Sequence, residues 1–134
     1  MNAAFAVIGS VLVFVAAVIH LGFFALESVL WSRPAVQRLF GVRDARDAEV
    51  ARPWAYNQGF YNVFLAIGAG VGLVFLGTGT FPEAGLALAV FSLASMLLAA
   101  VVLLTSNPRL WRGALLQGVV PALGILFLAL AQLA

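Results

Sequence analysis

Two ionisable side chains, His20 and Glu27, lie in the first of four long apolar stretches of the sequence. They are seven residues apart, which corresponds to about 700° of helical rotation and roughly 10 Å of rise, so they share one face of a helix. An imidazole and a carboxyl group on one face can donate and accept a proton or bind a polar ligand. Because burying such groups without a partner is costly, we expect a cavity beside them.

A second polar group opens the second apolar stretch, in the segment Asn57-Gln58-Gly59-Phe60-Tyr61-Asn62. Its four hydrogen-bonding side chains occupy about 140° of a helix circumference, which is not how a lipid-facing surface is built. Gln117 adds an amide near the start of the fourth stretch. We expect these groups to line one pocket that opens to the cytoplasm. The predicted catalytic pair is His20 and Glu27, and the predicted ligand-binding residues are Asn57, Gln58, Tyr61, Asn62 and Gln117.

Each of these residues also has a simpler interpretation. His20 could be a neutral imidazole that is hydrogen-bonded to a neighbouring helix, and Glu27 could pair with Arg33 or reach the lipid headgroups. The amides and the tyrosine of the second stretch could be ordinary interfacial residues. The coincidence of two ionisable groups with an amide-rich helix at matching depth favours a ligand or proton site.

The composition determines which elements position these residues. The chain has 134 residues, of which 64% are hydrophobic and 9% charged, whereas soluble domains are ~25% charged. Stretches of about 20 apolar residues cross a bilayer, and continuous apolarity without alternation indicates helices. We therefore predict an all-α membrane protein, a single four-helix transmembrane bundle over residues 1–134. The expected spans are 3–30, 56–76, 84–104 and 114–133, the first a mature helix because no basic residue precedes it.

The charges predict an orientation. All seven basic residues are arginines, and they lie in the loops 31–55 and 105–113, with none in the turn between the second and third spans. Basic loops face the cytoplasm, so we expect both termini outside and a multi-pass location in a bacterial inner membrane, with lipid as the surrounding partner. Trp31, Trp54 and Trp111 are expected to anchor the cytoplasmic helix ends at the membrane interface.

The first loop contains signals for helices of its own. Ser32 as N-cap and Pro34 at an early position predict a short interfacial helix. Asp44 is expected to cap a further helical turn that ends near Ala51, before Pro53 opens the second span.

Several classes of site are excluded. The chain has no cysteine, which excludes disulfides and thiolate metal sites. One histidine and one glutamate about 10 Å apart do not form a metal site. Seven dispersed arginines do not form the basic stripe that nucleic acids require. We expect no metal, no cofactor and no nucleic-acid partner. Small-residue steps such as Gly68 to Gly72 predict close helix contacts within the chain and no particular oligomeric state.

Three features together mark a resemblance: the spacing of His20 and Glu27, the segment 57–66, and Gln117-Gly118 followed by Pro121. With these, nearly the whole chain resembles a family of small bacterial integral-membrane proteins known only as a domain of unknown function. The resemblance implies a four-helix inner-membrane protein with the same polar residues. It implies no activity.

Three functions remain open from the residues. The first is a pocket that binds a small amphipathic or isoprenoid-like molecule and transforms it by acid–base chemistry or only holds it. The second is a small proton-coupled transporter, although the one-sided arginines oppose dual topology. The third is a non-catalytic structural protein, in which polar groups only join the helices.

Overall fold

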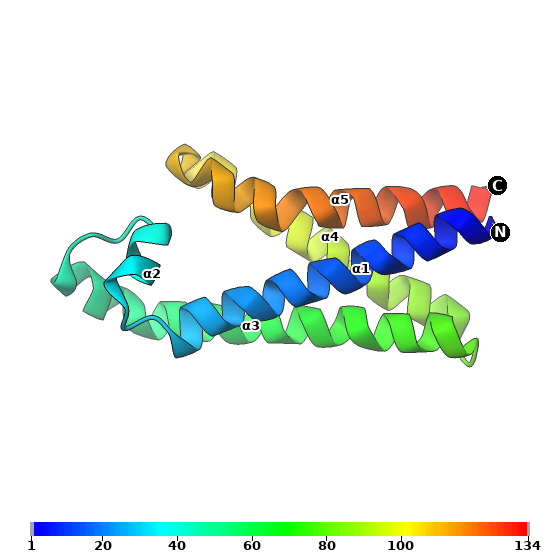
Figure 1. Ribbon diagram of the computed structural model, residues 1–134, viewed down its shortest axis with the longest axis horizontal. Coiled ribbons are helices and arrows are strands. Elements are labelled where there is room, and N and C mark those ends of the chain that lie inside the picture. The colour runs from blue at the N-terminus through cyan, green and yellow to red at the C-terminus, as the bar shows by residue number, and fades with distance from the viewer. Residues whose placement is uncertain (1, 134) are drawn as a thin grey trace.

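A computed structural model of the chain describes residues 2–133, which form an all-helical bundle (Figure 1). The elements in chain order are α1 (Ala3–Phe24), the π-helical segment η1 (Ala25–Val29), α2 (Pro34–Leu39), α3 (Ala45–Thr78), α4 (Pro82–Ser106), the 3₁₀ turn η2 (Pro108–Leu110) and α5 (Trp111–Leu133). Four helical segments are long and apolar enough to cross a membrane: Ala3–Val29, Ala45–Thr78, Pro82–Ser106 and Pro108–Leu133. The predicted four-helix membrane fold is confirmed.

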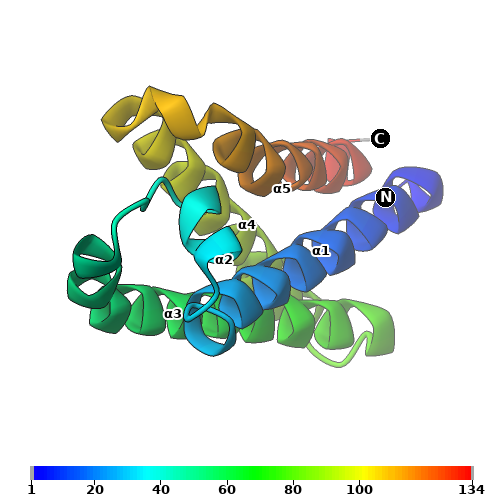
Figure 2. The ribbon, with the colours of Figure 1, turned by 60° about the vertical axis from the view of Figure 1, so that its left-hand side comes forward.

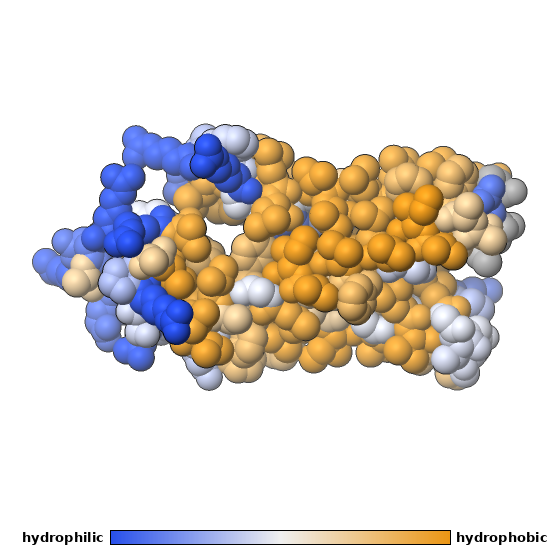
Figure 3. Space-filling model, viewed as in Figure 1, coloured by the Kyte–Doolittle hydropathy of each residue, from blue (hydrophilic) through white to orange (hydrophobic). Residues whose placement is uncertain are grey.

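The four spanning helices pack in a ring. α1 packs against α3 and α5, and α4 completes the ring between these two helices. Figures 1 and 2 show both termini at one end of the molecule, with α2 and the first turns of α3 at the other end. In the space-filling view, hydrophobic residues cover the length of the bundle and hydrophilic residues gather around α2 and the start of α3 (Figure 3). This distribution matches a protein embedded in lipid along its middle.

Small residues bring the helices close together. A Cβ added to Gly72 of α3 would lie 2.8 Å from backbone atoms of Gly85 and Ala89 in α4, so only glycine permits this approach. Gly118 similarly lies against Ala100, where an added Cβ would be 2.8 Å from the alanine methyl. The predicted small-residue contacts are therefore made within the chain, as is typical where lipid gives no hydrophobic force between helices.

α3 is longer than predicted. Asp44 is its N-cap, with the side chain accepting a hydrogen bond of 2.6 Å from the backbone N–H of Arg46. The helix then continues through Pro53 to Thr78, so the expected short turn and second span are one helix. A proline removes one helical hydrogen bond, but both Pro53 and Glu49, whose carbonyl is freed, are exposed, where water can replace the bond. The predicted helix α2 is present, although Arg33 and not Ser32 is its N-cap.

Candidate ligand-binding site

The end of the first span is a π-helix. In η1 the backbone N–H of Leu30 donates to the carbonyl of Ala25 at 2.8 Å, five residues earlier. A π-turn of this kind inserts an extra residue into a helix, changes the direction of the side chains that follow, and occurs frequently at functional sites. Glu27 lies in the middle of this segment and is only 9% exposed.

The carboxyl group of Glu27 is held by an amide of the neighbouring helix. Asn62 Nδ2 in α3 donates to Glu27 Oε2 at 2.8 Å and also to the carbonyl of Gln58 at 3.2 Å. Asn62 is buried as well. Within residues 2–133 one ion pair is present, between Arg52 and Glu49, so the alternative in which Glu27 pairs with Arg33 is wrong. Glu27 is thus a buried acid with a neutral partner.

Ser28, which follows Glu27, holds η1 close against α3. Ser28 Oγ donates to the backbone carbonyl of Tyr56 at 2.9 Å. Gly59 lies directly against Ser28, and a Cβ at this position would collide with the serine hydroxyl. The glycine of the 57–62 segment therefore permits the close approach of two helices, which positions Glu27 beside Asn62.

A pocket of about 430 Å³ lies where η1, the residues after it and α3 meet. Its volume is within the ~300–1,000 Å³ range of small-molecule sites. It combines a carboxyl group, a guanidinium group and hydroxyl groups with aromatic and aliphatic side chains. The lining residues are Glu27, Ser28, Val29, Trp31, Ser32, Arg52, Pro53 and Tyr56. Such a mixed lining suits a molecule with one polar and one apolar end.

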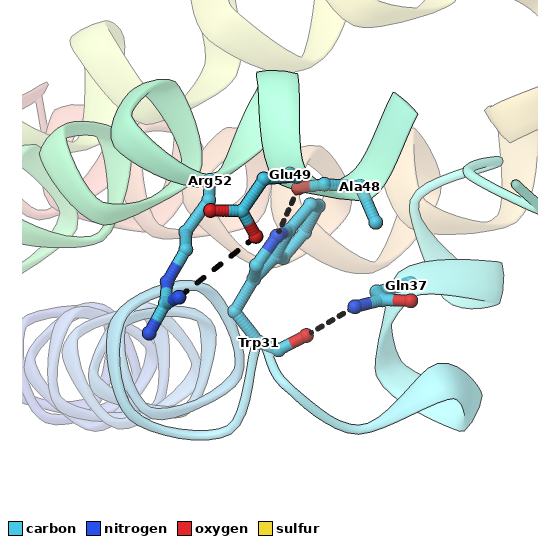
Figure 4. A network of polar contacts seen from close by, with 5 residues as sticks. All are labelled: Trp31, Gln37, Ala48, Glu49 and Arg52. Atoms are coloured by element: carbon cyan, nitrogen blue, oxygen red, sulfur yellow. Dashed lines mark hydrogen bonds and ion pairs between the residues drawn. The ribbon is translucent and has the colours of Figure 1, made fainter. Parts of the chain in front are cut away.

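Trp31 forms one wall of this pocket and is locked in place (Figure 4). Its indole Nε1 donates to the carbonyl of Ala48 at 3.1 Å, and its own carbonyl accepts from Gln37 Nε2 at 2.9 Å. Trp31 is 6% exposed, so its expected role as an interfacial anchor is wrong, because the loop packs it against α3. Trp54 and Trp111, at 75% and 48% exposure, have the free surface that an anchor needs.

Arg52 brings a positive charge to the pocket. Its Nη1 lies 3.9 Å from Glu49 Oε2, three residues earlier in α3, and both side chains are largely exposed (Figure 4). An exposed pair of this geometry is weak, so Arg52 can move toward or away from a bound molecule at little cost.

His20 is buried deeper in the bundle and is not among the lining residues of the pocket. Its Nδ1 lies 2.9 Å from the carbonyl of Ala16 in its own helix. Since a carbonyl only accepts, Nδ1 carries the hydrogen and Nε2 is left as an acceptor. The alternative in which His20 bonds to a neighbouring helix is therefore not what this bond shows, because its partner Ala16 lies in the same helix. The imidazole also meets Phe23 edge-on, with ring centroids 5.7 Å apart.

The remaining predicted residues are dispersed. Asn57, Gln58 and Tyr61 are exposed on the surface of α3, and Gln117 is half-buried in α5. Of the seven predicted site residues, the structure joins Glu27 and Asn62 by a side-chain hydrogen bond. Among these seven, Glu27 is the one that lines the pocket.

Sequence reasoning missed several residues of the pocket, chiefly Ser28, Arg52 and Tyr56. Ser28 directly follows the singled-out Glu27, which was a usable signal. In the sequence Arg52 was used only to predict the membrane orientation, because no local pattern shows that η1 and α3 meet beside it.

One comparison with known proteins finds a match. A family described as "Protein of unknown function (DUF1304)" matches residues 14–129, a range that includes the whole pocket. No curated protein and no solved structure matches the chain. Because the match extends over most of its length, the chain belongs to the DUF1304 family.

Proposed function

We propose that this protein binds a small amphipathic or isoprenoid-like molecule at the membrane surface, with the polar end of that molecule in the pocket and its apolar part in the bilayer. The observation that carries the proposal is the buried carboxyl of Glu27 in the wall of a pocket of about 430 Å³. Val29 and Pro53 add apolar surface to the same pocket. A whole membrane lipid exceeds this volume, so a headgroup-sized part of the ligand would occupy it.

If the ligand is also transformed, Glu27 is the group that exchanges a proton with it. Its carboxyl lines the pocket, and the hydrogen bond from Asn62 leaves one carboxyl oxygen for the ligand. His20 is the second proposed group, and its free acceptor Nε2 follows from the bond of Nδ1 to Ala16. A reaction through both groups requires a proton path from the pocket into the bundle.

The distribution of arginines supports the orientation of this site. We propose that α2 and the start of α3 face the cytoplasm of a bacterial cell, with both termini on the other side of the inner membrane. The chain has no cysteine, so single cysteines report topology cleanly. A membrane-impermeant maleimide should label Thr80→Cys in intact spheroplasts and Ala35→Cys only after permeabilisation. The reverse pattern would show the opposite orientation.

Binding can be tested before the ligand is identified. Protein purified in mild detergent should carry a lipid-like molecule that solvent extraction and mass spectrometry detect, and Glu27→Gln should reduce its yield several-fold. Glu83→Gln is the matched control, because Glu83 lies in the first turn of α4 at the opposite end of the bundle. Equal yields from all three proteins would refute the proposal.

A structural role is the second candidate, and the hydrogen bonds between η1 and α3 favour it. Glu27 to Asn62 and Ser28 to Tyr56 join the same two segments. Interhelical bonds in membranes are worth ~0.6 kcal/mol each on average, so this role predicts a lower melting temperature for Glu27→Gln with no change in any bound molecule.

A further inference from the structure

We propose that the ligand of the pocket is a cationic amphiphile whose polar end is an ammonium group. This inference rests on the proposed function, because it names the ligand class for the same pocket. The pocket contains a buried acid, Glu27, with which an ammonium group would pair.

The first argument is the unbalanced acid in the pocket. Glu27 is 9% exposed, and its hydrogen-bond donor is the uncharged amide of Asn62. Across residues 2–133 the one ion pair joins Arg52 and Glu49, which leaves Glu27 without a cation. A buried carboxylate is stable when a positive charge accompanies it, and a bound ammonium supplies that charge.

The second argument is the charge balance at the rim. Arg52 also lines the pocket, but Glu49 lies 3.9 Å from its guanidinium and water surrounds both side chains. The lining itself holds one acid, Glu27, and one guanidinium, Arg52. Because Arg52 has an acidic neighbour in water whereas Glu27 has an uncharged donor, Glu27 gains more from a charged ligand, which favours a cation.

The third argument is the chemistry of the walls. Ser28 uses its hydroxyl hydrogen in the bond to Tyr56, so the lone pairs of that oxygen remain free to accept N–H bonds from an ammonium. Trp31 and Tyr56 give the lining aromatic surface, which attracts cations. Val29 and Pro53, also in the lining, provide an apolar exit for an alkyl chain.

Three probes with the same twelve-carbon chain test the inference: dodecylamine, dodecanol and dodecanoate. The protein is reconstituted in nanodiscs of phosphatidylcholine, a lipid without N–H donors, and empty nanodiscs correct for partitioning. Trp54→Phe and Trp111→Phe leave Trp31 as the one tryptophan, and its fluorescence reports binding at pH 7. Dodecylamine, which is protonated because alkylamines titrate near pH ~10.4, should bind at least about tenfold more tightly than dodecanol, as expected for one charge-assisted hydrogen bond.

Variants then assign the effect to charge. Glu27→Gln should abolish the preference for dodecylamine, and Glu83→Gln should preserve it. Arg52→Gln should tighten dodecylamine binding a few-fold, and Glu49→Gln should weaken it by a similar factor. Both of these residues are exposed on α3, so their variants keep the inference testable even if Glu27→Gln fails to fold.

The outcomes separate the two proposals. Tightest binding of dodecanoate, or a preference for the amine that survives Glu27→Gln, would overturn the ammonium inference and leave the pocket as an amphiphile site. A saturable response to none of the three probes would overturn the proposed function as well.

Discussion

The two ends of the bundle are held together by different kinds of interaction. At the end near the α3–α4 turn and the termini, helices meet through small residues, as where Gly72 lies against Gly85 and Ala89. At the end near α2, the segments are joined by directed hydrogen bonds: Ser28 and Trp31 donate to backbone carbonyls of α3, and Glu27 accepts from Asn62. The α2 end also has one close contact, where Gly59 lies against Ser28, but the residues after η1 meet α3 through the indole bond of Trp31, which leaves room for a pocket. The pocket with Glu27 and Arg52 lies at the hydrogen-bonded end.

The largest effect on stability is expected from a substitution at the closely packed end of the bundle. Gly72→Ala places a methyl 2.8 Å from backbone atoms of α4, and overpacking of this kind lowers the free energy of unfolding by about 1–3 kcal/mol. Thermal unfolding in detergent, followed by circular dichroism, measures it. Gly70→Ala is the matched control, because its added Cβ would meet no atom within 4 Å. Equal melting temperatures for the two variants would contradict the packing argument.

A smaller effect is expected from the bond that holds the site. Asn62→Leu leaves the buried Glu27 carboxyl without its donor, at a cost of about 1–2 kcal/mol in the free energy of unfolding. Asn57→Leu changes the same residue type on an exposed surface and should stay within about 0.5 kcal/mol of wild type. Chemical denaturation of the three proteins gives the comparison. If Asn57→Leu costs as much as Asn62→Leu, the bond to Glu27 is not what stabilises this end.

The smallest effect concerns the loop. Trp31→Phe removes the indole N–H that bonds to Ala48 and should cost about 0.5–1 kcal/mol. The loop should then open more frequently, so trypsin should cleave after Arg38 and Arg43 several-fold faster. Trp54→Phe, at an exposed tryptophan, serves as the reference. An unchanged cleavage rate in Trp31→Phe would show that the indole bond does not hold the loop closed.

The helices were predictable, because lipid permits only helices and closed barrels, and the four apolar stretches lack the alternation of a barrel strand. The π-turn was not. A prediction that rotates each residue by 100° assumes a regular helix, and the extra residue in η1 changes the direction of Glu27 relative to His20.

The partner of Glu27 was partly readable from the sequence. Gly59, Ala66 and Ala69 are buried in α3 and recur at helical spacing with Asn62, which places Asn62 on the face that contacts other helices. Asn57 falls outside this stripe and is exposed. Residue type alone did not distinguish the two asparagines, whereas their small neighbours did. The roles of Arg52 and Trp31 depend on how the loop folds back onto α3, which no local pattern encodes.

The length of α3 has a consequence for how a ligand would reach the site. Its 34 residues span about 51 Å, whereas a hydrocarbon core is about 30 Å thick, so several turns must lie outside the hydrocarbon. Arg52 and Pro53 lie in those early turns, beside the pocket. A molecule could therefore arrive sideways from the lipid or directly from the aqueous phase. Its exchange rate between these two reservoirs would be governed by the length of its chain, since each added CH₂ favours the lipid by about 0.8 kcal/mol.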